Sequence, residues 1–326
     1  MELLAGDIGG TNTRLTIYRT TEDNRYAALH ERVFPSGKFP DLEAILAQFL
    51  GGIEQRIGRA CFGVAGPVID QTCDATNLPW RISAAQIRQR FGFEQCWLLN
   101  DLEANAWGIG ALSDQDLAIL NAGNPKARGN ASIISAGTGL GEAGLYWDGR
   151  MHRPFASEGG HTDFSPSDRL EFALFERLAG EFGRVSWERV VSGPGLEAIY
   201  TFLRDHHASP TTDWLDKEMR DKGVAPVVSH MALERKDPLC VEALDLFVRL
   251  YAREAGNHAL KIMAAGGVYL GGGIAPQILP RLQQADFIQT FCDKGRMRPL
   301  MQAMPVKVIL NDKAALLGAA RFAALQ

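Results

Sequence analysis

Apolar runs alternate with turn residues through the first hundred positions. Runs of this length, closed by glycine or polar residues, predict buried strands over residues 3–8, 15–18, 30–34, 59–64 and 96–99. The Gly-Gly-Thr-Asn sequence at 9–12 predicts a tight turn between the first two strands. Asp41 is expected to cap a helix over residues 42–50, where apolar positions recur at helical spacing. This part of the chain therefore has the pattern of a mixed α/β protein.

A similar order returns in the second half of the chain. Apolar runs predict strands over residues 131–135, 144–147, 268–270 and 306–310. Glycine-rich turns occupy 137–141 and 271–273. Residues 172–265 have a mostly helical pattern, in which a polar stretch at 206–223 predicts a surface excursion.

A short Asn-Asp sequence occurs in the same context in both halves of the chain. Asn100-Asp101 and Asn311-Asp312 each follow an apolar strand and open a segment rich in alanine and glycine. Small side chains let a neighbouring helix approach closely, so we expect these two helices to cross each other between domains. Two halves of this kind predict a duplicated α/β fold with two lobes and a central cleft.

Length and charge narrow the class of protein. The 326 residues suit two domains. With a net charge of −4 and scattered basic residues, nothing in the charge points to nucleic acid or to an anionic membrane as a partner. The five cysteines show no CxxC pattern, which argues against a disulfide framework and a structural zinc site. The chain shows no signal-peptide pattern and no run of about 18 apolar residues, so we expect a cytoplasmic protein.

Two glycine turns are candidates for phosphate binding. At residues 7–12 and 135–141, backbone N–H groups could approach phosphate oxygens without obstruction by side chains. Asp7, at a strand end, could hold Mg²⁺ through water. Either turn alone could equally be an ordinary hairpin, and neither is accompanied by a Walker lysine. A dinucleotide fingerprint is excluded for the second turn because a strand follows it.

Asn100 and Asp101 follow a predicted strand. Asp101 could accept the proton of a substrate hydroxyl that attacks a phosphoryl group. Both residue types also favour the N-cap of a helix, and the two roles of Asp101 are compatible.

Glu158 and His161 lie three positions apart around two glycines. They could bind neighbouring hydroxyls of a sugar, whereas a metal site would need a third ligand. Glu188, by its own pattern, could be a surface acid of a helix. Asn77 could be a turn residue or a polar contact to substrate.

Eight segments together resemble the bacterial-type glucokinase family of hexokinases, in the actin-like ATPase superfamily. They run in order over nearly the whole chain: GDIGGTN, TNLPW, NDLEANAWG, AGTGLG, SEGGHTDF, WERVVSGPG, GGVYLGGGI and NDKAALLGAA. The most specific is SEGGH followed by ERVVSGPG. The resemblance implies a ribonuclease H-like fold, with a small lobe at 1–111 completed by 305–326 and a large lobe at 112–304. It also implies a homodimer.

The resemblance further implies roles for individual residues. The ATP phosphates would contact Gly6, Asp7, Ile8, Gly9, Gly10, Thr11, Gly137, Thr138 and Gly139, and the adenosine side Gly271, Gly272 and Gly273. Asp7 would serve Mg²⁺. Glucose would contact Asn100, Asp101, Glu158, His161 and Glu188, with Asp101 as the base that activates its 6-hydroxyl. The CxCGxxGC zinc motif of the related repressor–kinase group is absent, which argues against that branch.

Three alternatives remain at this point. A kinase for another hexose or a hexosamine would share the ATP-binding segments. A non-catalytic actin-like ATPase would share the glycine turns but has no need of SEGGH and ERVVSGPG. A sugar-responsive regulator would require a DNA-binding module, for which the sequence offers no candidate.

Overall fold

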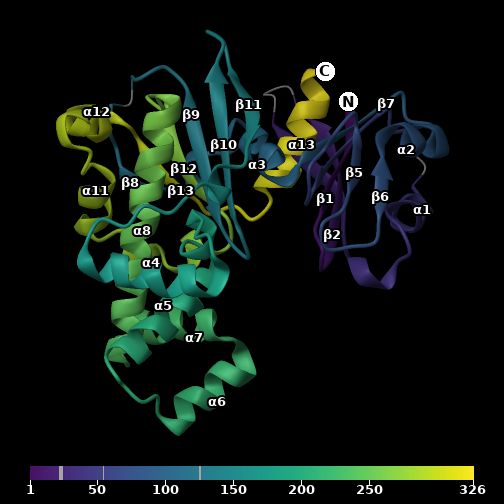
Figure 1. The fold of residues 1–326 in the computed structure, drawn as a ribbon. Coiled ribbons are helices and arrows are strands. Elements are labelled where there is room, and N and C mark those ends of the chain that lie inside the picture. The colour runs from purple at the N-terminus through teal and green to yellow at the C-terminus, as the bar shows by residue number, and fades with distance from the viewer. Residues whose placement is uncertain (22–24, 54, 125) are drawn as a thin grey trace. The chain divides into compact units, whose positions relative to one another are not determined.

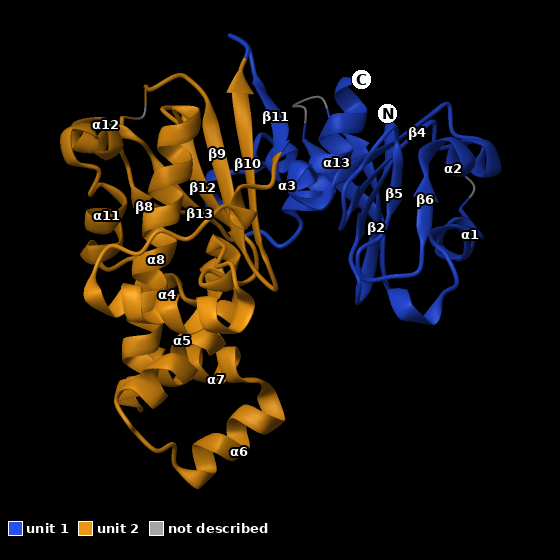
Figure 2. Ribbon diagram, in the orientation of Figure 1, with its two compact units in different colours: residues 1–117, 148–156, 311–326 blue, residues 118–147, 157–310 orange. Residues whose placement is uncertain are grey.

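The computed structural model describes residues 1–21, 25–53, 55–124 and 126–326. They form two compact units, coloured separately in Figure 2. Unit 1 comprises residues 1–117, 148–156 and 311–326, and unit 2 comprises residues 118–147 and 157–310. Unit 1 is thus assembled from three separate segments of the chain.

The sheet of unit 1 has the strand order β3-β2-β1-β4-β7 (Figure 1). Its strands are β1 (Glu2–Ile8), β2 (Asn12–Thr20), β3 (Tyr26–Pro35), β4 (Arg59–Val64) and β7 (Gln95–Asn100), and β5 (Thr72–Asp74) pairs separately with β6 (Arg81–Ser83). The first three strands are antiparallel, whereas β4 and β7 extend the sheet in parallel from β1. The five strands predicted for this region are confirmed.

Both faces of this sheet are covered by helices. Leu4 and Ile8 pack in a core with α1 (Leu42–Leu50) and α2 (Ala84–Phe91), while Leu3 and Ala5 pack with α3 (Asp101–Ile109) and α13 (Ala314–Leu325). Alternate side chains of a strand point to opposite faces, so a strand covered on both sides is apolar throughout. Asp41 caps α1 as expected, because its Oδ1 accepts the Ala44 N–H at 2.7 Å.

Helices α3 and α13 pack closely against each other. A methyl group at Gly318 would overlap the carbonyl oxygen of Ala104, and one at Gly108 would overlap that of Ala314. Their contact was expected from the small residues that follow Asn100 and Asn311. Both helices belong to unit 1, however, so this contact lies within one unit.

Unit 2 repeats the arrangement, with its strands in the order β10-β9-β12-β13-β8. They are β8 (Leu117–Asn121), β9 (Ala131–Ala136), β10 (Leu140–Trp147), β12 (Gly267–Gly271) and β13 (Val306–Ile309), while β11 (His152–Ser157) follows β10 along the chain. Strands β9 and β10 are antiparallel, and β9, β12 and β13 are parallel. The same succession of an antiparallel hairpin and then parallel strands occurs in unit 1, which confirms the expected duplication.

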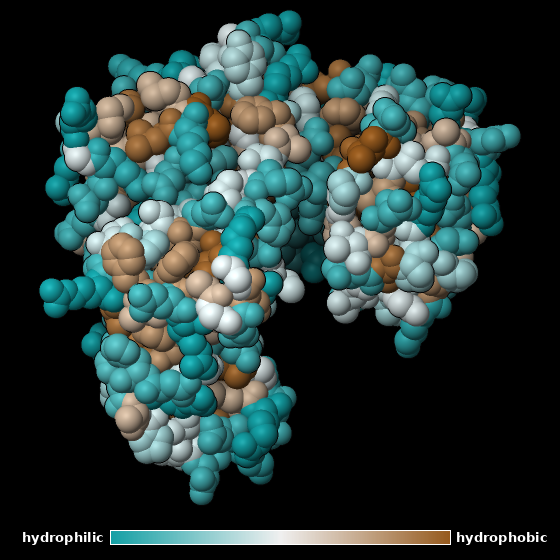
Figure 3. Space-filling model, viewed as in Figure 1, coloured by the Kyte–Doolittle hydropathy of each residue, from teal (hydrophilic) through white to brown (hydrophobic). Residues whose placement is uncertain are grey.

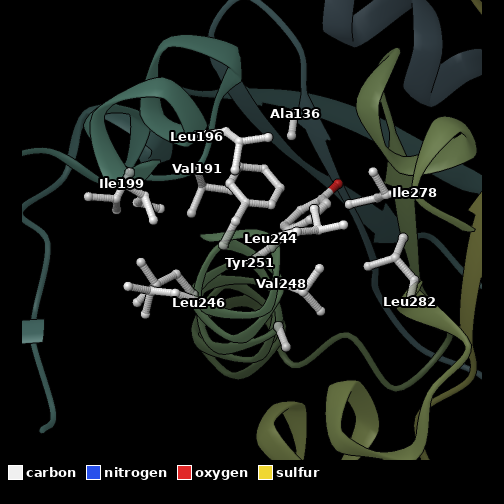
Figure 4. Packing of buried hydrophobic residues seen from close by; sticks show 14 of the residues in the cluster. Ala136, Val191, Leu196, Ile199, Leu244, Leu246, Val248, Tyr251, Ile278 and Leu282 are labelled. Atoms are coloured by element: carbon white, nitrogen blue, oxygen red, sulfur yellow. The ribbon is translucent and has the colours of Figure 1, made fainter. Parts of the chain in front are cut away.

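Helices supply most of the core of unit 2. They are α4 (Arg169–Phe182), α5 (Gly193–His206), α6 (Asp213–Lys222), α7 (Val224–Leu233), α8 (Pro238–Ile262), α9 (Ile274–Gln277), α10 (Leu279–Leu282), α11 (Ala285–Phe291) and α12 (Arg298–Ala303). Figure 4 shows Leu244 and Tyr251 of α8 among the side chains of Val191, Leu196 and Ile278. The buried Tyr251 hydroxyl donates to the carbonyl oxygen of Ile134, so α8 is fixed against β9.

The polar stretch at 206–223 contains helix α6. Its residues Leu215 and Met219 are buried, and four positions separate them on one helical face. The other positions are charged or polar, which explains why the segment has a polar composition although it is ordered.

Large apolar side chains are exposed at single positions on both units, among them Ile69, Tyr146, Phe155 and Trp214. On the face shown in Figure 3, apolar residues are interrupted by polar ones. Exposure of this scattered kind is common in globular proteins. Among the described residues, no helix has both the length and the apolar character needed to cross a membrane.

Candidate active site

The turn between β1 and β2 brings the first glycine segment to the end of the unit 1 sheet. The Gly9 N–H donates to the carbonyl oxygen of Asn12 at 3.0 Å, which closes the turn. Ser36 fixes it from outside, because its hydroxyl donates to the Gly9 carbonyl oxygen at 2.8 Å and its N–H to that of Thr11. The sequence carried no signal for this role of Ser36, which depends on the pairing of β3 with β2.

Asn77 lies directly against this turn. A methyl group at position 10 would come within 2.8 Å of the Asn77 Cβ, so only glycine allows the approach. The exposed Asn77 is thereby placed beside the predicted phosphate-binding backbone, whereas its sequence pattern had left a plain turn residue as an alternative.

Asp7 is a partly buried carboxylate near the end of β1. Burial of its carboxyl group and the nearby Asp101 carboxylate raise the pKa of Asp7 to about 6, against a smaller opposite effect of Arg14. Arg14 faces Asp7 across the β1–β2 pairing and donates to Asp312 at 2.7 Å. The turn position predicts this register, so Arg14 could have been identified from sequence as the cross-strand partner of Asp7.

Asn100 and Asp101 have different roles at the junction of β7 and α3. Asn100 is the N-cap, since its Oδ1 accepts the Leu102 N–H at 3.0 Å, and its amide donates to the Gly66 carbonyl oxygen at 3.1 Å. Asp101 is the first residue of the helix, and its Oδ1 accepts the same Leu102 N–H at 2.8 Å. Asn100 therefore provides the side-chain cap of α3, and the Asp101 carboxylate also bonds the first turn of the helix.

In unit 2 the structure brings Glu158, His161 and Glu188 together. His161 lies with its Nε2 3.9 Å from Glu158 and its Nδ1 3.8 Å from Glu188. The side chains of Glu158 and His161 are more than half exposed, and that of Glu188 is 31% exposed. Two carboxylates thus flank one imidazole in an accessible position, as binding of several hydroxyl groups requires.

Glu188 also holds the second glycine turn. Its Oε2 accepts the Leu140 N–H at 3.0 Å, and a methyl group at Gly139 would come within 2.6 Å of the same oxygen. Glu188 lies on the 3₁₀ helix Trp187–Arg189 and could have been a surface acid by its sequence alone. The structure instead connects it to the turn between β9 and β10.

The glycines at 137–139 and 271–273 lie at neighbouring strand ends. Gly271 of β12 pairs in register with Ser135 of β9, so the two glycine segments follow adjacent parallel strands. A methyl group at Gly137 or Gly273 would meet no other atom within 4 Å, which leaves these backbones accessible. Gly272 has φ of +78° and abuts the Ala136 carbonyl oxygen, a position that requires glycine.

The residues of unit 1 fit a Mg²⁺ ion that keeps most of its water. Among the described residues, no group of three or more His, Cys, Asp or Glu side chains could hold a metal ion. Mg²⁺ in kinases is commonly held by one or two carboxylates together with substrate phosphates. Asp7 meets this requirement, because a partly buried carboxylate beside Asp101 is stabilised by a nearby cation.

The family model described as glucokinase matches residues 4–326. Glucokinases of Nostoc punctiforme and of a Synechocystis species are 41% and 42% identical to the chain, and each alignment covers 99% of this chain and 98% of the relative.

Solved structures agree with this result. A glucokinase from an Antarctic psychrotroph superposes with a TM-score of 0.89 at 29% identity, over 100% of this chain and 99% of that one. A glucokinase of Balamuthia mandrillaris, solved in complex with glucose, gives a TM-score of 0.80 at 21% identity, over 99% of this chain and 93% of that one. The two sheets thus have the ribonuclease H-like topology of actin-like proteins, as expected. The chain belongs to the glucokinase family of hexose kinases.

Proposed function

We propose that the protein transfers the γ-phosphoryl group of ATP to the 6-hydroxyl of D-glucose, with Asp101 as the general base. Family membership supports the hexose and the nucleotide. The observation that carries the proposal is the double contact of Glu188, which lies 3.8 Å from His161 and bonds the Leu140 N–H of the glycine turn. One side chain suited to a sugar is therefore also bonded to a backbone suited to phosphate.

Contacts to the hexose are assigned to Glu158, His161, Glu188, Asn77 and Asn100. A carboxylate that accepts from a hydroxyl forms a charge-assisted hydrogen bond, which is about twice as strong as a neutral one. Several such bonds fix the orientation of the sugar, and correct orientation of the attacking hydroxyl contributes several kcal/mol to catalysis.

The nucleotide would be bound mainly by backbone N–H groups. The turns at 6–11 and 137–139 are assigned to the phosphates, and Gly271, Gly272 and Gly273 to the adenosine side. Mg²⁺, when bound near Asp7, would neutralise negative charge on the phosphate oxygens. The raised pKa of Asp7 supports this assignment, because a cation compensates the cost of an ionised carboxylate in a partly buried position.

The chemical step needs a base for one proton. As the 6-oxygen of glucose forms its bond to the γ-phosphorus, the bond to the bridging oxygen breaks and its electron pair leaves with ADP. Asp101 accepts the hydroxyl proton during this transfer. The hydrogen bond from the Leu102 N–H to Asp101 Oδ1 orients the carboxylate for the task.

A coupled assay of ADP formation tests the proposal. It would use glucose, mannose, fructose, glucosamine and N-acetylated hexosamines as acceptors, and ATP, ADP and polyphosphate as donors. The highest kcat/KM is expected for glucose with ATP, and magnesium should be required. A higher kcat/KM for a hexosamine would show that glucose is not the preferred substrate. ATP hydrolysis that no hexose accelerates would indicate an actin-like ATPase without kinase activity.

A further inference from the structure

Three ionisable side chains form a buried cluster behind the turn that carries Glu158 and His161. Glu142 lies on β10, whereas Glu254 and His258 lie on α8. Their side chains are 1%, 0% and 3% exposed. None of the three belongs to the proposed phosphate or hexose contacts, and buried charges are costly unless they are paired or neutralised.

Glu142 touches the backbone of the turn itself. A methyl group at Gly159 would overlap Glu142 Oε2, and one at Gly160 would overlap the Leu140 carbonyl oxygen. Both glycines therefore rest directly on β10. Because Glu158 and His161 flank these two glycines, a displacement of Glu142 would move both side chains.

The protonation of His258 bears on that of Glu142. The His258 Nε2 lies 3.1 Å from the Ala143 carbonyl oxygen, which can only accept, so Nε2 carries a proton. Burial lowers the pKa of His258, so the ring is neutral and its Nδ1 carries a lone pair. This Nδ1 lies 3.2 Å from Glu142 Oε2, a distance at which its lone pair would repel an ionised carboxylate. Burial of Glu142 and the Glu254 carboxyl, to which Glu142 donates a hydrogen bond, raise the pKa of Glu142 to about 8, in agreement with a neutral acid.

The other charged groups around the cluster favour ionised Glu254. Asn257 donates to Glu254 Oε2 at 2.8 Å, and the Lys261 ammonium lies 3.6 Å from Oε1. Lys294 lies nearby, with its ammonium donating to Asn257 Oδ1 at 2.6 Å. Burial raises the pKa of Glu254, and Asn257, Lys261 and Lys294 oppose that rise. The two carboxyl groups therefore share one negative charge, which resides on Glu254.

We propose that Glu142, as a neutral carboxylic acid hydrogen-bonded to Glu254 and packed against His258, is a positioning residue that supports Gly159 and thereby orients Glu158 and His161 for the hexose. This role rests on the proposed function, since it requires that those two side chains bind the substrate. Loss of the Glu142 proton would remove the bond to Glu254 and place a second negative charge beside it. The turn would then lose its support, and hexose binding would weaken at alkaline pH.

Two substitutions and a control test the role. Glu142→Leu removes the hydrogen bond, whereas Glu142→Gln keeps a neutral donor of nearly the same shape. The control is Glu171→Gln, in which a second fully buried carboxylate of unit 2, paired with Arg249 and Arg253 on α8, loses its charge. The KM and kcat for glucose would be measured from pH 6.5 to 9.5, with melting temperatures for all variants.

The Leu variant should raise the glucose KM about tenfold, as expected for lost support of a hydrogen-bonded turn, with a smaller change in kcat. The Gln variant should restore the KM at pH 7 to within about twofold of the wild type, since it keeps a neutral donor to Glu254. Above pH 8 the KM should rise in the wild type and stay constant in the Gln variant. The control should lower the melting temperature without changing the pH dependence of KM. A wild-type KM that does not change with pH, equal to that of the Gln variant, would overturn the proposal even if the Leu variant failed to fold.

A measurement on the backbone separates this role from the proposed function. The amide NMR signals of Gly159 and Gly160 should titrate with a midpoint near pH 8 in the wild type and not in the Gln variant. If they titrate but glucose is not phosphorylated, the support of the turn stands and the proposed substrate is wrong. If glucose is phosphorylated but neither the amides nor the KM responds, the positioning role is wrong.

Discussion

The Glu188 carboxylate accepts a hydrogen bond from the Leu140 N–H at 3.0 Å, although 48 positions separate the two residues. The bond joins the start of β10 to the 3₁₀ helix Trp187–Arg189. His161 lies 3.8 Å from the same carboxylate. One side chain therefore contacts a proposed sugar-binding residue and the backbone of a proposed phosphate-binding turn.

Substitution of Glu188 should separate these two contacts. Glu188→Gln retains an oxygen for the Leu140 N–H but loses the charge, so the glucose KM should rise about tenfold with little change in the ATP KM. Glu188→Ala also releases the turn and should raise the KM for ATP as well. Steady-state kinetics with both substrates would measure this. Glu197→Gln, an exposed acid on α5, is the control, and equal effects of both Glu188 variants on ATP would contradict the separation.

Asp101→Asn should lower kcat by about two to four orders of magnitude, the range of general-base effects, because the amide cannot accept the hydroxyl proton. Glucose affinity, measured by calorimetry, should stay within a few-fold, and circular dichroism should show intact folding. Asp114→Asn, a nearby exposed acid, should leave kcat unchanged. Near-normal turnover of a folded Asp101→Asn protein would remove Asp101 from the role of base.

The pKa of about 6 for Asp7 predicts the acidic limit of activity. Below that pH the carboxyl group is protonated and cannot attract Mg²⁺, so kcat/KM should fall as the pH drops through about 6. The Asp312 carboxylate contributes to the raised pKa, and Arg14 lowers it. Asp312→Asn should therefore move the acidic limb to lower pH.

The control for this shift is Asp286→Asn, which removes another carboxylate bonded to an arginine, in unit 2. This substitution should leave the pH at which kcat/KM falls unchanged. An acidic limb that moves to higher pH in Asp312→Asn would show that another group controls it. Profiles recorded at several Mg²⁺ concentrations would separate proton binding from metal binding.

Gly318→Ala should destabilise the protein. The added methyl group would overlap the Ala104 carbonyl oxygen and force α13 away from α3, and overpacking of this kind costs about 1–3 kcal/mol. Gly180→Ala is the matched control, since this glycine of α4 has no atom within 4 Å of the added methyl group. It should stabilise by about 0.5–1 kcal/mol through helix propensity. Denaturant unfolding measures both, and equal stabilities would contradict the close packing.

Much of the fold follows from local patterns. Residues 3–5 are apolar because both faces of β1 are covered, and the glycine turns mark the hairpins that begin both sheets. Segments whose structure depends on contacts between residues far apart in the sequence were harder to predict. Helix α6 was not predicted within the polar stretch at 206–223, because Leu215 and Met219 are its only buried residues and give a weak apolar pattern.

The candidate site shows the same division. Asp7, Asp101 and the glycines were identified because strand ends and turns are visible in the sequence. Glu188 required family resemblance, since its partner Leu140 lies on another element. Ser36 and Glu142 were not found at all. Glu142 stands within an apolar strand, and only the fold brings it next to His258 and Gly159.

The packing of α13 in unit 1 has a consequence for synthesis. Ala315, Leu316 and Ala319 share a core with Leu3 and Ala5 of the first strand. On the ribosome, β1 emerges before all of unit 2 has been translated, and α13 emerges after it. One face of the first sheet is therefore covered by α3 without α13 while residues 118–310 are made. Unit 2 can complete its own core earlier, so the segment translated first is among the last to reach its final packing.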